Sequence, residues 1–340
     1  MPASIFAAAF GGRSGSVSLT ELQIDGSAAT GPLTASAAGL TEYEGDPAVI
    51  AAAVTGHDVL VVHGAPVTAE VLDAAPLRLV CCARGGPVNV DVAAATARGI
   101  PVACAPGRNA RAVAELTVGF ALALIRRVPA ARLRLLDGMP LGDSNFEGGE
   151  FIGTEAASTT LGLIGLGHVG REVAALAQAL GFEVIGYDPV LPESLPAGVR
   201  VLPLDDLLSQ ADVVSVHARA TSGNRNLLGP AAFARMRRGS LFINTARESL
   251  VDEDALREAL ASGWLAGAAL DVTTRPPDGA RHPLLDLPNV VVTPHIGGAT
   301  EETLRRGAEL TAAAVAQIAA GQVPDHLVNP QVLAGQTGTP

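Results

Sequence analysis

A glycine-rich apolar segment near the middle of this 340-residue chain restricts its fold more than any other feature. Residues 160–170 read TLGLIGLGHVG, an Ala- and Leu-rich stretch follows, and a second apolar run ends at Asp188. This order is that of a dinucleotide-binding βαβ unit, in which a strand, a glycine turn, a helix, a second strand and a carboxylate follow one another. Gly165 permits the tight turn, Gly167 lets backbone N–H groups approach a pyrophosphate, and Gly170 allows close helix–strand packing. The motif therefore predicts an α/β nucleotide-binding domain.

The carboxylate at the end of the second apolar run indicates which dinucleotide binds. Asp188 would accept hydrogen bonds from the adenosine ribose hydroxyls, and its charge would repel a 2′-phosphate. His168 and Val169 lie within the glycine turn, and we expect them to contact the same cofactor. The sequence therefore predicts NAD rather than NADP.

Composition excludes several other kinds of chemistry. The chain has no lysine, so its 23 basic residues are all arginine, which excludes Schiff-base chemistry, pyridoxal phosphate attachment and a phosphate-loop lysine. A net charge of −11 argues against nucleic acid or an anionic membrane as a partner. The three cysteines form neither a disulfide framework nor a zinc pattern, so no metal site is expected. With no membrane-spanning run and no basic segment ahead of the N-terminal apolar residues, we expect a cytoplasmic protein.

Strand candidates on both sides of the glycine motif indicate two α/β domains. Before the motif, candidates alternate with Ala-rich helical stretches and lie at 58–62, 77–82 and 100–103. Further candidates recur in βαβ rhythm at 160–165, 182–187, 212–216, 240–244, 267–271 and 289–292. Their continuous apolar character is typical of a parallel sheet that helices cover on both faces.

The late position of the motif predicts that one domain is discontinuous. We expect a smaller, flavodoxin-like substrate (catalytic) domain formed by 1–108 and 300–340, into which an NAD-binding Rossmann domain, 109–299, is inserted. Other expected elements are helices at 112–126 and 301–320, an exposed arm or loop at 137–158 and a possible strand at 4–9.

Arg247 and His295 are the candidate catalytic residues. Each comes shortly after a predicted strand, at the edge where the carboxyl ends of parallel strands line a ligand crevice. The guanidinium of Arg247 offers a planar fork to a carboxylate or carbonyl oxygen. His295 can pass a proton to or from a hydroxyl while a hydride moves to the cofactor. A solvated arginine and a packed histidine are the simpler alternatives, but the shared position beside a dinucleotide motif favours catalysis.

From about residue 58 to residue 330 the chain resembles the D-2-hydroxyacid dehydrogenases of the phosphoglycerate-dehydrogenase-like group. Besides the glycine motif, the resemblance rests on Gly85-Gly86, GIPVACAP at 99–106, NARAVAE at 109–115, NTAR at 244–247, ALDV at 269–272 and TPHIGG at 293–298. It implies two βαβ domains with the active site in a cleft, usually in a homodimer formed through the larger domain.

The resemblance also implies roles for single residues. Arg247 would bind and polarise the 2-oxo and carboxylate groups of a substrate, and His295 would be the acid/base. Backbone N–H groups near Arg84, Gly85 and Gly86, together with Asn109, would hold the carboxylate. The cofactor-binding positions would be Gly165, Gly167, His168, Val169, Gly170, Asp188, His217, Ala218, Thr245, Ala246, Asp271 and Gly298. Asp271 and Glu115 could equally be capping or packing polar groups.

One departure from the family pattern affects the third catalytic residue. The family places a glutamate five positions after the aspartate of the Leu-Asp-Val motif, where this chain has Pro276. That glutamate hydrogen-bonds the histidine, orients its ring and favours the imidazolium. Without it, His295 should be a poorer acid for reducing a keto acid, unless Asp278 takes the role. The resemblance includes formate dehydrogenases, which lack the glutamate, so the departure does not exclude hydride transfer.

The residues leave the substrate open. Arg84, Arg108 and Arg111 could suit a phosphorylated or polyhydroxylated acid, whereas hydroxypyruvate or glyoxylate needs only Arg247, and exposed arginines are usually just solvated. The leading hypothesis is an NAD-dependent enzyme that interconverts a small D-2-hydroxy acid and its 2-oxo acid. The alternatives are an NAD(H)-sensing, corepressor-like protein with little turnover and a formate- or phosphite-type dehydrogenase.

Overall fold

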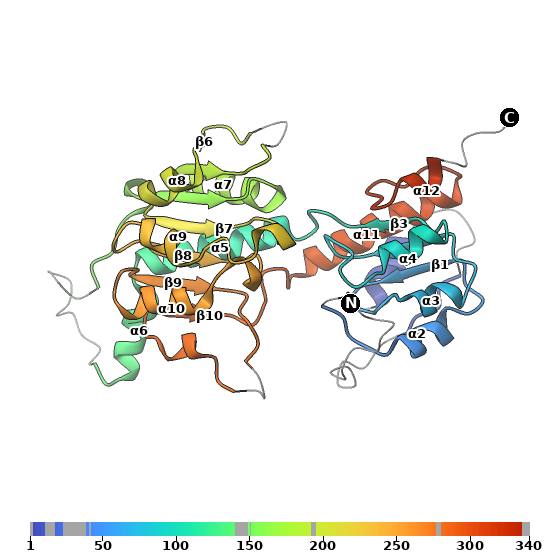
Figure 1. The fold of residues 1–340 in the computed structure, drawn as a ribbon, viewed down its shortest axis with the longest axis horizontal. Coiled ribbons are helices and arrows are strands. Elements are labelled where there is room, and N and C mark those ends of the chain that lie inside the picture. The colour runs from blue at the N-terminus through green and yellow to red at the C-terminus, as the bar shows by residue number, and fades with distance from the viewer. Residues whose placement is uncertain are drawn as a thin grey trace. The chain divides into compact units, whose positions relative to one another are not determined.

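The computed structural model describes residues 3–10, 18–22, 39–40, 42–139, 149, 151–191, 195–276 and 280–334. The chain divides into two compact units, which are drawn in Figure 1. Unit 1 comprises Met1–Arg108 and Thr300–Pro340, and unit 2 comprises Asn109–Ala299.

Unit 2 is built on a parallel sheet whose described strands run in the order β10-β9-β8-β7-β4-β5-β6. The strands are β4 (Thr160–Ile164), β5 (Glu183–Tyr187), β6 (Arg200–Val201), β7 (Val213–Val216), β8 (Leu241–Asn244), β9 (Gly267–Leu270) and β10 (Val290–Val292). The chain starts at β4, continues outward through β5 and β6, and returns to add β7 on the other side of β4. Strand order therefore reverses between β4 and β7, which is where doubly wound sheets bind ligands.

Helices cover both faces of this sheet. They are α5 (Ala110–Ile125), α6 (Val128–Leu136), α7 (His168–Ala179), α8 (Leu204–Gln210), α9 (Pro230–Arg235) and α10 (Glu253–Ala261), with 3-10 turns at Ala156–Ser158, Ser222–Asn224, Glu248–Leu250 and Pro283–Asp286. Apolar side chains of α5 and α7 form one buried cluster with the sheet, and those of α8, α9 and α10 form the other. In the second cluster the rings of Phe233 and Phe242 meet edge to face, with centroids 5.4 Å apart.

Unit 1 has a smaller parallel sheet, with described strands in the order β1-β2-β3. These strands are β1 (Val59–Val62), β2 (Leu79–Cys82) and β3 (Val102–Cys104), and the helices are α1 (Ala3–Phe10), α2 (Pro47–Val54), α3 (Ala69–Asp73), α4 (Val92–Ala97), α11 (Glu301–Ala319) and α12 (Gln331–Ala334). Helix α11 brings the chain back after unit 2, and its Ala312 and Val315 pack with Phe10 of α1 against one face of the sheet. The α/β class with a Rossmann domain is thus confirmed.

The nine strands predicted between residues 58 and 292 are present, each within two residues of its expected ends. The prediction of a strand at 4–9 was wrong, because this segment forms helix α1. Its Ala-rich sequence favours a helix, in which Phe6 and Phe10, four residues apart, lie on the face that packs into unit 1. The expected arm at 137–158 falls partly outside the described residues, and its described end contains a 3-10 turn.

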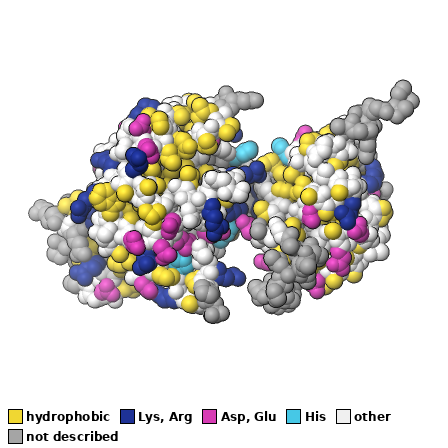
Figure 2. All heavy atoms as spheres, viewed as in Figure 1, with side chains coloured by type: hydrophobic (Ala, Val, Ile, Leu, Met, Phe, Trp, Pro, Cys, Tyr) yellow, Lys and Arg dark blue, Asp and Glu magenta, His cyan; other side chains and the backbone are white. Residues whose placement is uncertain are grey.

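Many ion pairs between arginine and carboxylate side chains lie on the surface. Figure 2 shows positively and negatively charged side chains interspersed over each unit. Ion pairs of this kind include Arg98–Asp73 in unit 1 and Arg200–Glu183 in unit 2. In the described part of the chain, the helices are too short or too polar to cross a membrane.

Candidate active site

The glycine turn after β4 has the close contacts that require glycine. Gly165 has a φ of +102°, and a Cβ atom there would lie 2.6 Å from the backbone nitrogen of Ala218, which follows β7. A Cβ atom at Gly170 would lie 2.0 Å from the carbonyl oxygen of Gly165. The turn, the first part of α7 and the segment after β7 therefore pack backbone to backbone at the point where strand order reverses.

Gly167, by contrast, faces open space. A Cβ atom there would meet nothing within 4 Å. Gly167 is the N-cap of α7 and provides no side-chain cap, so the first N–H groups of the helix, including those of the exposed His168 and the half-buried Val169, are directed away from the helix. A helix N-terminus with room beside it favours a phosphate anion. These residues fit the pyrophosphate of NAD.

Asp188 fixes the glycine turn through the backbone. Its carboxylate accepts hydrogen bonds from the N–H of Leu166 at 2.8 Å and from the N–H of Val190 at 3.0 Å. A carboxylate offers about four lone-pair sites, so Asp188 keeps capacity for further donors. Its contact with the adenosine ribose stays a prediction.

His217 lies half-buried where β7 ends. Its Nε2 is 2.9 Å from the hydroxyl oxygen of Ser215, and its Nδ1 is buried without a hydrogen-bond partner. Burial lowers the pKa of His217 to about 3, so the ring is neutral at physiological pH. The half-buried Ala218 follows it against the glycine turn.

Side-chain hydrogen bonds shape the loop that carries Arg247. Asn244, the last residue of β8, accepts from the N–H of Ala246 at 3.0 Å and donates to the carbonyl oxygen of Arg247 at 2.9 Å. The hydroxyl oxygens of Thr245 and Thr117 are 2.9 Å apart, which ties the loop to α5. The half-buried guanidinium of Arg247 donates from Nη1 to the carbonyl oxygen of Ala246 at 2.7 Å.

The buried carboxylate of Asp271 holds the loop that carries His295. Asp271 follows β9 and is 2% exposed. One of its oxygens accepts from the hydroxyl of Thr293 at 2.6 Å and from the N–H of Ile296 at 2.8 Å, and the other accepts from the N–H of Gly297 at 2.7 Å. The N–H of His295 donates to the carbonyl oxygen of Asp271 at 2.9 Å.

Within this loop His295 has a left-handed backbone, with a φ of +56°. Non-glycine residues adopt this conformation at a cost, and they keep it only where their surroundings determine it. The hydrogen bonds between Asp271 and residues 295–297 hold the backbone in this conformation. They leave the side chain of His295 exposed. A rigid backbone under an exposed imidazole is what an acid/base catalyst requires.

The loops that carry the two candidate catalytic residues leave the same edge of one sheet. β8, β9 and β10 are neighbours, and the N–H of Asp271 donates to the carbonyl oxygen of Asn244 at 2.9 Å. The loop of Arg247 and the loop of His295 are therefore both joined to Asp271. Gly298 ends the second loop against α5, because a Cβ atom there would lie 3.2 Å from the amide nitrogen of Asn109.

The predicted carboxylate-binding residues other than Asn109 lie on unit 1, after β2. Arg84 forms an ion pair with Glu42, with nitrogen and oxygen 3.2 Å apart. The N–H groups of Gly85 and Gly86 donate to no acceptor among the described residues. They are free to bind an anion.

The segment that carries Pro276 is held by residues that sequence reasoning missed. Glu253 accepts from the N–H of Thr274 at 2.8 Å and lies 3.0 Å from Nε2 of His282, and both side chains are largely buried. In the described part of the chain the ring of His295 has no hydrogen-bond or ion-pair partner, and Asp278 lies outside the described residues. An acidic residue at the first turn of a helix is so common that Glu253 gave no signal in the sequence.

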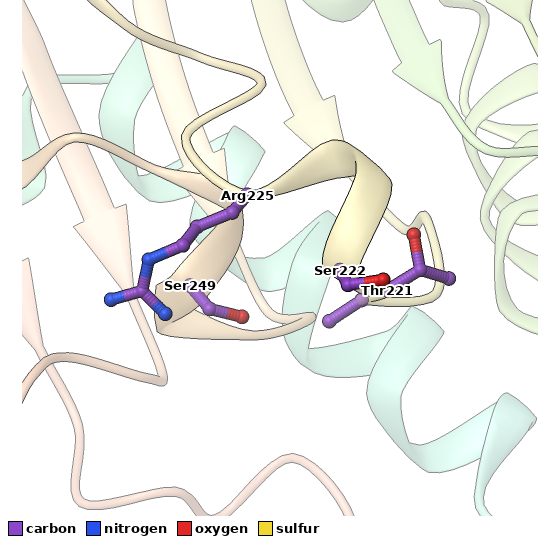
Figure 3. A pocket seen from close by; sticks show the side chains of 5 residues that line it. Thr221, Ser222, Arg225 and Ser249 are labelled. Atoms are coloured by element: carbon purple, nitrogen blue, oxygen red, sulfur yellow. The ribbon is translucent and has the colours of Figure 1, made fainter.

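A shallow pocket on unit 2 was also missed. Figure 3 shows its lining side chains, which come from the turn after β7 and from the turn after β8. The lining residues are Ala220, Thr221, Ser222, Arg225 and Ser249. The N–H of Asn226 donates to the carbonyl oxygen of Ser249 at 2.8 Å and joins the two turns. The pocket contains none of the predicted site residues.

Two glycine variants should separate folding from cofactor binding. Gly167→Ala should keep the melting temperature, because its Cβ enters open space, but should weaken NADH binding about tenfold or more by filling the phosphate position. Gly170→Ala should lower the melting temperature, because its Cβ overlaps the carbonyl of Gly165. Thermal denaturation and calorimetric titration with NADH measure both effects. Unchanged NADH affinity in Gly167→Ala would contradict the assignment.

Two half-buried histidines with lowered pKa values predict that acid weakens the fold. Burial lowers the pKa of His217 to about 3, and burial together with Arg108 and Arg84 lowers the pKa of His63 to about 4, from 6.5. The unfolded chain therefore binds more protons in this range, so the stabilisation is complete above about pH 6.5 and is lost as the pH falls through the folded-state values. The free energy of unfolding should fall by a few kcal/mol, since each pKa unit corresponds to about 1.4 kcal/mol.

Denaturant titrations between neutral pH and about pH 4 test this dependence. His217→Asn should flatten it, whereas the exposed-site control His326→Asn should not. Equal slopes for the original chain and His217→Asn would show that His217 does not contribute.

Comparison with known proteins identifies the family of the chain. Residues 118–297 match the model of the D-isomer specific 2-hydroxyacid dehydrogenase NAD binding domain, which confirms NAD as the cofactor. The chain is 40% identical over 270 residues to D-3-phosphoglycerate dehydrogenase of Rattus norvegicus, covering 78% of this chain and 49% of that protein. It is 41% identical over 259 residues to hydroxypyruvate reductase of Thermotoga maritima, covering 74% of this chain and 82% of that protein.

A solved structure of D-lactate dehydrogenase with NAD+ from Lactobacillus jensenii is similar at a TM-score of 0.74 and 26% identity, covering 84% of this chain and 90% of that one. The chain spans about half the length of the D-3-phosphoglycerate dehydrogenases that it matches. The chain belongs to the D-isomer-specific 2-hydroxyacid dehydrogenase family.

Proposed function

We propose that this protein is an NAD-dependent oxidoreductase that interconverts a small D-2-hydroxy acid and its 2-oxo acid. The observation that carries the proposal is the position of His295, which is exposed on a loop fixed by Asp271, at the sheet edge that also carries Arg247. The glycine turn after β4 lies on the carboxyl side of the same parallel sheet. Groups for substrate binding, proton transfer and cofactor binding thus share one edge.

The two candidate catalytic side chains divide the work between them. Arg247 binds the substrate carboxylate and polarises the 2-oxo group with its guanidinium. His295 gives a proton to the oxygen of the 2-oxo group during reduction and takes it back from the hydroxyl during oxidation. NAD, when bound, supplies or accepts the hydride.

The remaining predicted residues bind and orient. The N–H groups of Gly85 and Gly86, with Arg84 and Asn109, hold the substrate carboxylate. Asp188 accepts from the adenosine ribose, and its charge selects NAD over NADP. Thr245, Ala246 and Asp271 border the nicotinamide, and His217 and Ala218 border the ribose.

The relatives suggest the kind of substrate. Two relatives at 40% and 41% identity are named for 3-phosphoglycerate and for hydroxypyruvate. A small acid of the phosphoglycerate, hydroxypyruvate or glyoxylate type is accordingly the proposed substrate.

One observation favours a second candidate, a protein that senses NAD(H) with little turnover. Pro276 replaces the family glutamate, and the ring of His295 has no acidic partner among the described residues. A carboxylate partner favours the imidazolium, so a histidine without one carries the proton needed for reduction less often. A formate- or phosphite-type dehydrogenase is the other candidate that needs no such glutamate.

We also propose a cytoplasmic homodimer formed through unit 2. Helix α6 supports this proposal, because Val128, Leu135 and Leu136 are 55%, 42% and 66% exposed. Apolar side chains gathered on one exposed helix are typical of a contact surface.

NADH oxidation with a panel of 2-oxo acids tests the proposed activity. Hydroxypyruvate, glyoxylate or a related acid should be reduced, and Arg247→Gln should lower kcat/KM at least about 100-fold, or about 3 kcal/mol of transition-state stabilisation. The control Arg257→Gln removes an exposed arginine that pairs with Asp254 on α10, and it should change kcat/KM less than about twofold.

Two other results would reassign the protein. Binding of NADH without turnover of any 2-oxo acid would favour the sensing candidate. Reduction of NAD by formate or phosphite, without reaction of 2-hydroxy acids, would favour a formate- or phosphite-type dehydrogenase.

A further inference from the structure

Arg108, which follows β3 in unit 1, has a guanidinium that the described residues do not neutralise. Its Nε and Nη1 atoms are buried and have no hydrogen-bond partner, whereas Nη2 is not among the enclosed atoms. No carboxylate forms an ion pair with it in the part of the chain that the structure describes. A buried N–H group without an acceptor costs about 1–3 kcal/mol, more when it is charged, so such an arrangement needs a compensating partner.

The other two arginines considered from the sequence already have acidic partners. Arg111 pairs with Glu115 at 2.7 Å and with Glu172 at 3.6 Å on the surface of unit 2. Arg84 pairs with Glu42 at 3.2 Å and also donates to the carbonyl oxygen of Glu42 at 2.6 Å. Arg108 is therefore the member of this set with free capacity for an anion.

The surroundings of Arg108 add further positive charge and another unused polar atom. Arg306 of α11 donates from Nε to the carbonyl oxygen of Arg108 at 2.7 Å and pairs with no carboxylate among the described residues. His63, which directly follows β1, has a buried Nδ1 without a partner. Burial, followed by Arg84, lowers the pKa of Arg108 from its ordinary value. Burial, followed by Arg108 and Arg84, lowers the pKa of His63 to about 4.

These side chains converge because the sheet of unit 1 is parallel. His63, Arg84 and Arg108 come after β1, β2 and β3, whose carboxyl ends share one edge. Backbone bonds join the three loops: the N–H of Ala83 donates to the carbonyl oxygen of Val62 at 2.8 Å, and that of Ala105 donates to the carbonyl oxygen of Arg84 at 2.7 Å. The free N–H groups of Gly85 and Gly86 lie in the same cluster of loops.

We propose that Arg108, supported by His63 and Arg306, binds a second anionic group of the substrate, a carboxylate or phosphate at the end away from the 2-oxo group. This inference rests on the proposed function and makes it more specific, because it selects 2-oxo acids with an anionic tail. The N–H groups of Gly85 and Gly86 take the first carboxylate, and Arg108 takes the tail. A guanidinium held in place beforehand binds an anion without the cost of ordering a flexible side chain.

A binding experiment tests the anion site without any turnover. Inorganic phosphate is titrated calorimetrically into the protein as it is, into Arg108→Gln and into the control Arg111→Gln. Arg108→Gln should weaken phosphate binding at least about tenfold, and Arg111→Gln should leave it within about twofold. Arg108→Gln should also keep or raise the melting temperature, because it removes an uncompensated buried charge. Equal phosphate affinity in the original chain and Arg108→Gln would overturn the proposal.

A second experiment tests selection by the tail. Two substrate pairs differ only at the far end: 2-oxovalerate against 2-oxoglutarate for a carboxylate, and hydroxypyruvate against its phosphate ester for a phosphate. The original chain should prefer the anionic member of at least one pair about tenfold or more in kcat/KM, and Arg108→Gln should remove this preference through KM. The pair that shows the effect identifies the tail chemistry. An equal loss on charged and uncharged tails would overturn the proposal.

The two experiments separate the two proposals. If no 2-oxo acid is reduced by protein that binds NADH, the proposed enzymatic function fails, whatever the phosphate titration shows. If 2-oxo acids are reduced but Arg108→Gln changes neither phosphate binding nor tail preference, the enzyme assignment stands and the anion site fails.

Discussion

The buried carboxylate of Asp271 is the interaction on which the candidate active site depends. It accepts three hydrogen bonds from the loop after β10, and the backbone of the same residue joins that loop to β8. A carboxylate that is only 2% exposed is stable only when hydrogen-bond donors surround it. The conformation of the loop and the burial of the carboxylate therefore depend on each other. The left-handed backbone of His295 is the consequence.

The cofactor side of unit 2 depends on close backbone packing instead of charge. Gly165 and Gly170 bring the turn after β4, helix α7 and the segment after β7 together at distances that no side chain allows. Asp188 then fixes the turn by accepting from Leu166. In each half of the site a carboxylate thus accepts hydrogen bonds from the backbone N–H groups of a loop, while His295 stays exposed and Arg247 stays half-buried.

The sequence predicts most of this architecture for physical reasons. Parallel strands buried on both faces are continuous apolar runs, so segments such as 59–62, which reads VLVV, stand out. Three features of the site each come shortly after a strand: the glycine motif, Arg247 and His295. They can therefore be recognised in the sequence without knowledge of tertiary contacts. Segment 4–9 was misread, because a short apolar run does not distinguish a strand from a buried helix.

The sequence did not predict contacts between residues that lie far apart along the chain. Glu253 and His282 meet across 29 positions, and each has an ordinary local explanation, in a helix first turn and before a proline. Arg108 resembled other surface arginines in the sequence. That no carboxylate of the described residues pairs with it became visible only when the loops after β1, β2 and β3 were brought together.

The most direct test of this account is the turnover of Asp271→Asn at saturating NADH, compared with Asp286→Asn, which alters an exposed carboxylate paired with Arg281. Asparagine replaces one acceptor oxygen by a donor that faces backbone N–H groups, so kcat should fall about 10- to 100-fold while Asp286→Asn stays within about twofold. Hydrogen exchange of the Gly297 amide should accelerate in parallel. An unchanged kcat with an unprotected Gly297 amide would contradict the central role of Asp271.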